Sequence, residues 1–76
     1  MTNLRRIRIE NGLTKAELAE LSGVSVNMIV KYENGQRNID GAGLDILTKL
    51  AMALNVKIAD ILENKKLIEK VEKCMK

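Results

Sequence analysis

The sequence contains no histidine and no proline, and it has only one cysteine and one aromatic residue. Without histidine, the chain cannot form a His-based metal site or a histidine-dependent catalytic triad. The lone cysteine, Cys74, cannot form an internal disulfide, so we expect an intracellular protein. The chain also has no recognisable pair of catalytic carboxylates and no Gly-rich phosphate loop. We therefore expect neither an enzyme nor a protein that holds a metal or a cofactor.

Long hydrophobic runs are absent as well. No apolar stretch approaches the roughly 20 residues that span a bilayer. Residues 1–10 lack the apolar core of a signal peptide. These two absences predict a cytoplasmic protein with no membrane partner.

The residues that are present are typical of one small helical domain. Of the 76 residues, 46% are hydrophobic, which suits a folded chain rather than a disordered one. Abundant Leu, Ala, Lys and Glu, together with the scarcity of aromatics, favour helices over strands. The net charge of +3 is compatible with a nucleic-acid partner but is too small to require one.

Apolar periodicity and cap signals predict five helices in a single domain, followed by an amphipathic helical extension. The domain covers residues 1–63 and the extension covers residues 64–76. The expected helices run approximately over residues 2–11, 15–22, 26–34, 44–54 and from 59 onward. The start of the fourth helix is ambiguous, because Asp40 could cap an earlier start. Its apolar stripe consists of Leu44, Leu47, Leu50, Ala51 and Leu54.

The most informative stretch, residues 14–35, has the pattern of two short helices joined by a tight turn. Thr14 and Glu17 have the capping-box spacing, and Ser25 is placed to cap the second of these helices. Gly23 can take the positive φ that turns the chain sharply. The positions expected to hold the pair together are Leu18, Ala19, Gly23, Val24, Ile29 and Tyr32, with either Leu21 or Ser22 also facing inward. The pattern predicts that the second helix is presented outward at a fixed angle.

With these residues in place, the chain resembles helix-turn-helix regulators of the phage repressor/Cro type, also called the xenobiotic-response-element family. The matching segments, within about residues 3–63, are GLTKAELAELSGVS, I..YENG.RN and LTKLAMALNV..ADIL. The resemblance implies an all-α, five-helix fold whose third helix enters the major groove of double-stranded DNA. It also implies an inward salt bridge between Arg8 and Glu33.

The same resemblance indicates which residues meet DNA. The expected base-reading residues are Val26, Asn27, Met28 and Lys31, and the expected phosphate contacts are Lys15, Ser25, Gln36, Arg37 and Asn38. Asn27 could pair with an adenine edge, Lys31 could donate to guanine, and Val26 could pack on a thymine methyl. Lys15 stands where the family usually has a glutamine, which favours a phosphate contact over an amide one.

The leading hypothesis is a sequence-specific transcriptional repressor that binds a palindromic operator as a homodimer. Candidate interface residues are Leu67, Ile68, Val71 and Met75 of the extension, unless the extension folds back on its own monomer. One alternative is an antitoxin that represses its own operon and also binds a toxin. Another is a protein-interaction module without DNA binding. The outward face of the third helix is expected to carry Val26, Met28 and Val30. These residues either contact thymine methyls and sugars of DNA or bind such a protein partner.

Overall fold

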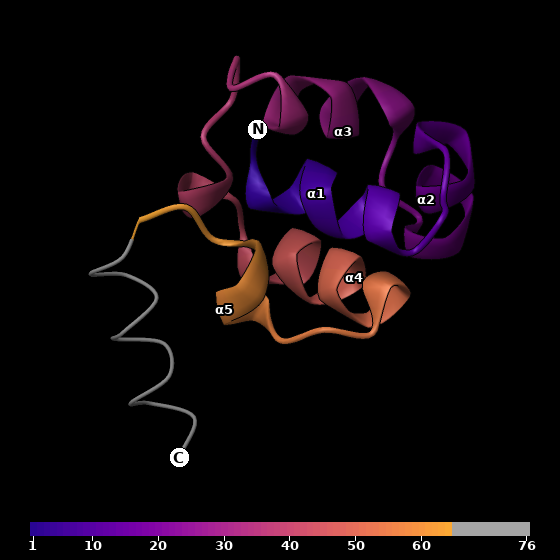
Figure 1. The fold of residues 1–76 in the computed structure, drawn as a ribbon. Helices are drawn as coiled ribbons and strands as arrows, with labels where there is room; N and C mark the ends of the chain where they lie inside the picture. The colour runs from indigo at the N-terminus through magenta and orange to yellow at the C-terminus, as the bar shows by residue number, and fades with distance from the viewer. Residues whose placement is uncertain (65–76) are drawn as a thin grey trace.

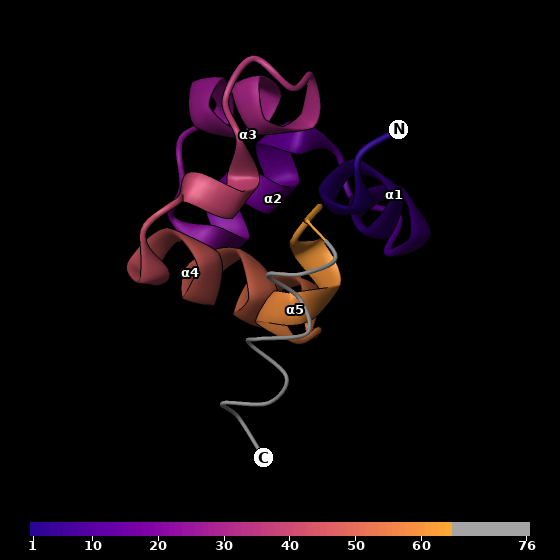
Figure 2. The same cartoon turned by 90° about the vertical axis from the view of Figure 1, so that its left-hand side faces the viewer.

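The structure, a computed structural model, describes residues 1–64, and within that range it is entirely helical. The elements are α1 (Asn3–Glu10), α2 (Lys15–Ser22), α3 (Val26–Glu33), the 3-10 turn η1 (Ile39–Gly41), α4 (Leu44–Leu54) and α5 (Ile58–Ile61). Helix α3 lies along one side of the molecule, and α4 and α5 lie on the other (Figures 1 and 2). The predicted all-α, five-helix fold is confirmed. The predicted extension, with Leu67, Ile68, Val71 and Met75, lies outside the described residues.

One hydrophobic core joins all five helices. Each helix contributes a side chain that is completely buried, namely Leu4, Leu18, Ile29, Leu50 and Ile61. Removing one such side chain from water stabilises the fold by about 1.5–3 kcal/mol. Because a chain of this size has a small total stability, the angle of each helix depends on these few contacts.

The end of α5 is fastened to the start of α1. The Asn3 side-chain amide donates to the Leu62 carbonyl at 2.9 Å, and the Asn3 backbone N–H donates to Glu63 Oε1 at 2.6 Å. The Glu63 N–H in turn donates to Asp40 Oδ1 in η1 at 2.8 Å. Residues 62 and 63 are therefore held between α1 and η1, and Leu62 closes one end of the core with 1% of its surface exposed.

The region between α3 and α4 corrects the sequence prediction in two respects. Helix α4 begins at Leu44 after Gly43, so Asp40 is not its cap and instead lies in η1. Leu44 was expected to face inward, but it is 71% exposed. The reason is that Leu44 opens the helix, whereas the buried stripe of α4 begins almost a turn later at Leu47.

Two smaller points of the prediction are also settled. Helix α5 begins at Ile58, one residue earlier than expected. On α2, Ser22 is the buried alternative and Leu21 is 61% exposed. Burial of the Ser22 hydroxyl is tolerated because it accepts a hydrogen bond from the Val24 backbone N–H at 3.1 Å.

Candidate nucleic-acid interface

Local capping interactions define α2, α3 and the turn between them. The Thr14 hydroxyl accepts from the Glu17 N–H at 3.0 Å, and the Glu17 carboxylate accepts from the Thr14 N–H at 2.9 Å. The hydrogen bond from the Thr14 backbone N–H, followed by one with the Thr14 side chain, holds the pKa of the Glu17 carboxyl group below its ordinary value. Gly23 ends α2 with a φ of 77°, and the Ser25 hydroxyl caps α3. The predicted capping box, turn and second cap are all confirmed.

The inner face of α3 is anchored by apolar packing and by a buried ion pair. Ile29 and Tyr32 belong to the core. Arg8 of α1 donates from Nε and Nη2 to the two Glu33 carboxylate oxygens, at 2.7 and 3.1 Å. Its Nη1 donates to the Leu13 carbonyl at 2.7 Å. The implied Arg8–Glu33 bridge is confirmed, and it ties α1, the α1–α2 loop and α3 together.

The outer face of α3 presents a row of side chains to solvent. Asn27 and Lys31 are exposed and lie one helical turn apart, so they share a face. Val26, beside them, is 41% exposed. Ser25 is exposed before the helix, and Lys15, the first residue of α2, is half-buried. Asn27 and Lys31 therefore share the outer face of α3, and Val26 and Ser25 at the start of the helix are exposed as well.

The apolar cluster expected on this face is smaller than the sequence suggested. Met28 and Val30 are half-buried, and Met28 packs against the hydrophobic core. Met28 lies one helical turn before the buried Tyr32, so the two side chains are on the same side of α3. This position explains why the Met28 side chain packs against the core. Among these three residues, Val26 is the one that is exposed, at 41%.

The loop after α3 carries the remaining predicted phosphate contacts, Gln36, Arg37 and Asn38, and all three are exposed. The Arg37 backbone N–H donates to the Lys31 carbonyl at 3.1 Å, and its Nη1 donates to the Met28 sulfur at 3.1 Å. The Asn38 side-chain oxygen accepts from the Asp40 N–H at 3.0 Å.

Sequence reasoning missed both of the roles that these contacts give to Arg37 and Asn38. An Asn two residues before Asp40 is a common turn signal, so the Asn38 cap could have been found from the sequence. The Met28–Arg37 contact has no such signal.

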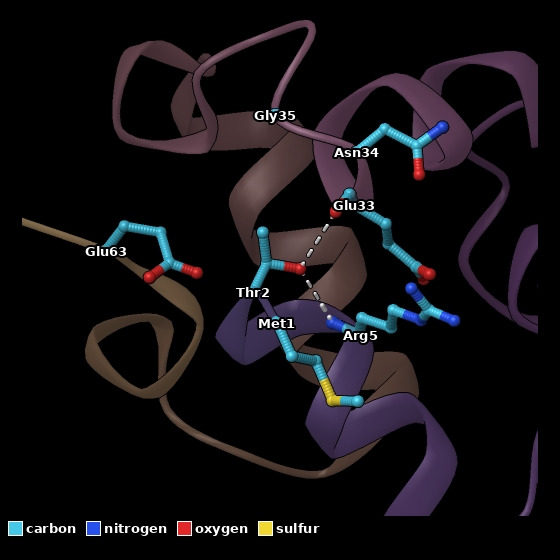
Figure 3. Close-up of a pocket in the computed structure, with 7 residues that line it drawn as sticks. All are labelled: Met1, Thr2, Arg5, Glu33, Asn34, Gly35 and Glu63. Carbon is cyan, nitrogen blue, oxygen red and sulfur yellow. Dashed lines mark hydrogen bonds between the residues drawn. The ribbon is translucent and has the colours of Figure 1, made fainter.

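A cleft of about 580 Å³ lies where the start of α1 meets the C-terminal end of α3 (Figure 3). It is lined by Met1, Thr2, Arg5, Glu33, Asn34, Gly35 and Glu63. The Thr2 hydroxyl accepts from the Arg5 N–H at 3.3 Å and donates to the Glu33 carbonyl at 3.4 Å. The cleft thus borders a contact that fixes α1 against the C-terminal end of α3.

Neither a metal site nor a membrane-spanning helix is found within residues 1–64. No group of three or more His, Cys, Asp or Glu side chains there could hold a metal ion. No described helix is long and apolar enough to cross a membrane.

Comparison with known proteins agrees with this geometry. The helix-turn-helix family matches residues 4–61, from α1 through α5. The antitoxin PezA of Streptococcus pneumoniae serotype 4 (strain ATCC BAA-334 / TIGR4) is 31% identical over 70 residues. That match covers 92% of this chain and 42% of PezA, so the chain spans less than half of its curated relative. No solved structure matches the chain. Because the matched range contains the whole α2–α3 unit and its core, the chain belongs to the helix-turn-helix family of the phage repressor/Cro type.

Proposed function

We propose that this protein is a transcriptional repressor that binds a palindromic DNA operator as a homodimer, with α3 in the major groove. The observation that carries the proposal is the division of α3 into two faces. Its inner face is fixed by Ile29, Tyr32 and the Arg8–Glu33 ion pair, whereas Asn27 and Lys31 face solvent together. A helix held rigidly from behind can present its outer side chains to base edges in one defined register.

The outer face has the chemistry to distinguish base pairs. The Asn27 amide can both donate to and accept from adenine, and the Lys31 ammonium can donate to guanine O6 or N7. Val26 can pack on a thymine methyl group. Each good pairing of this kind is worth about 1–3 kcal/mol of discrimination.

Phosphate contacts would set the register of the helix on the duplex. Lys15 at the start of α2 and Arg37 after α3 flank the base-reading residues on both sides in the chain. Ser25, Gln36 and Asn38 can add neutral hydrogen bonds to phosphate oxygens, Asn38 through its amide nitrogen. Such contacts supply affinity that depends on salt but not on sequence.

A dimer is proposed because one helix reads too few base pairs to locate a single site in a genome. Two α3 helices related by a two-fold axis would meet half-sites about 10 bp apart. Selection of bound sequences from a random DNA pool tests both points together. A palindromic consensus supports the proposal, and recovery of unrelated sequences contradicts it.

Substitutions then test which residues read the sequence. Replacing Asn27 and Lys31 together by Ala should abolish sequence preference, while Arg37→Ala should weaken binding to all sequences alike. The matched control is Lys49→Ala, which removes an exposed lysine on α4, the side of the molecule away from α3. Sequence preference that survives the double substitution would show that α3 is not the reader.

A second candidate function, an autoregulating antitoxin, is favoured by the similarity to PezA. It keeps the same DNA chemistry and adds a toxin as protein partner. Co-expression with a toxin encoded beside the gene should restore growth if this function is correct. If the protein shows no salt-dependent binding to genomic DNA fragments, the result would instead favour a third function, a protein-interaction module without DNA binding.

A further inference from the structure

Met28 differs from the other predicted base-reading residues in its surroundings. Its side chain is half-buried and packs against the hydrophobic core, whereas Val26, Asn27 and Lys31 are exposed. Its sulfur lies 3.1 Å from Nη1 of Arg37, nine residues along the chain. The thioether therefore accepts a hydrogen bond within the protein.

Arg37 is held to α3 at two points. Its backbone N–H donates to the carbonyl of Lys31, and its guanidinium donates to the Met28 sulfur. A guanidinium has five N–H donors, so the contact with sulfur leaves others to bind a phosphate. Because Met28 packs against the core, it gives this exposed, long side chain a point of attachment on α3.

We propose that Met28 is a positioning residue: it orients Arg37 for a DNA phosphate before DNA arrives, and it does not read bases. This inference rests on the proposed function. Ordering a long side chain at an interface costs conformational entropy and so weakens binding. An Arg37 side chain that is already held in place avoids this cost, and the protein then binds DNA more tightly. The effect is independent of base sequence, because phosphates carry no sequence information.

The test compares Met28→Leu, Arg37→Ala and the double variant in DNA-binding titrations over a range of salt concentrations. Leu keeps the volume and apolar character of Met28 but removes the sulfur. Met28→Leu should weaken binding about two- to tenfold on every DNA sequence, as expected for ordering one long side chain. Its salt dependence should stay that of the wild type, because Arg37 still reaches the phosphate. Arg37→Ala should instead lower the salt slope by about 0.9.

The decisive comparison is the double variant. In the Arg37→Ala background, Met28→Leu should cause no further loss, because there is no guanidinium left to orient. Equal melting temperatures for wild type and Met28→Leu check that core packing is preserved. An additive loss, a loss confined to particular base pairs, or wild-type affinity in Met28→Leu would each overturn the inference.

A measurement without DNA separates this inference from the proposed function. In methyl-labelled protein, the Met28 resonance is identified by its absence in Met28→Leu. Arg37→Ala should shift that resonance, and Lys49→Ala should not. An unchanged resonance in Arg37→Ala overturns the contact even if the wild type binds DNA. Failure of the wild type to bind any DNA would overturn the proposed function, and this inference with it.

Discussion

At the residue scale, the buried ion pair between Arg8 and Glu33 decides how α3 is held. The Glu33 side chain is completely buried and the Arg8 side chain is 10% exposed. The Glu33 carboxylate accepts two hydrogen bonds from Arg8, and Arg8 also donates to the Leu13 carbonyl. These hydrogen bonds offset the cost of removing two charges from water. The pair also links helices that are distant in the chain, so its loss would weaken the attachment of α3 to α1.

Arg8→Ala should therefore be strongly destabilising, because it leaves the Glu33 carboxylate buried without a partner. We expect a loss of about 3–5 kcal/mol in the free energy of unfolding, measured by urea denaturation. The control is Arg6→Ala, which breaks the exposed pair with Glu10 and should cost at most about 0.5 kcal/mol. Equal unfolding midpoints for the two variants would contradict the role assigned to Arg8.

Gly23 gives a second prediction at this scale. Its φ of 77° lies in the left-handed region, and an added Cβ would meet no atom within 4 Å. Gly23→Ala should therefore cost about 1–2 kcal/mol through backbone strain alone. Gly41→Ala, also without steric contact and without a positive φ, should be close to neutral. The difference between their melting temperatures checks the argument, and a Gly23→Ala protein as stable as Gly41→Ala would refute it.

At the scale of the element, α2 depends on the capping box that starts it. The helix has eight residues, which is too short to be stable in isolation, and four N–H groups at its start lack helical partners. Thr14 and Glu17 satisfy two such donors between them. The cap thereby fixes where α2 begins and where Lys15 is presented.

The cap predicts a pH dependence. The pKa of Glu17 is lowered in the folded protein by its hydrogen bonds from Thr14, so folding favours the carboxylate. The stability it adds is present above its ordinary pKa of about 4.3 and is lost as the pH falls through the lower folded value. Thermal unfolding of wild type and Glu17→Gln should thus differ at neutral pH and converge in acid. A difference that stays constant over this range would contradict the sign of the effect.

At the scale of the whole molecule, the residues that follow α5 are hydrogen-bonded to the start of α1 and to η1. Hydrogen bonds from Asn3 and to Asp40 hold Leu62 and Glu63 in place against α1 and η1. The predicted extension, residues 64–76, lies almost wholly outside the described residues. Its proposed role is in the dimer.

Truncation after Glu63 tests that role. The shortened protein should remain helical by circular dichroism, because Glu63 and its contacts are kept. It should sediment as a monomer and bind the operator much more weakly, since two linked half-site contacts become one. A truncated protein that stays dimeric would exclude the extension as the interface.

The sequence by itself determined the helices and the helix-turn-helix, because caps, turns and apolar periodicity are local features. Thr14, Gly23 and Ser25 act within a few residues of themselves, so their roles can be predicted without the fold. Only the tertiary structure decided which side chains are exposed. The exposure of Leu44 depends on where the core ends, and this is set by the angles at which distant helices pack.

The same distinction applies to the interface. The family resemblance placed Asn27 and Lys31 on the outward face of α3, and both residues are exposed. The predicted role of Met28 was drawn from its position on that helix, but its burial and its contact with Arg37 depend on the core and on the path of the loop. A contact between a helix and a loop forms only once both are placed in three dimensions, so no local pattern in the sequence encodes it.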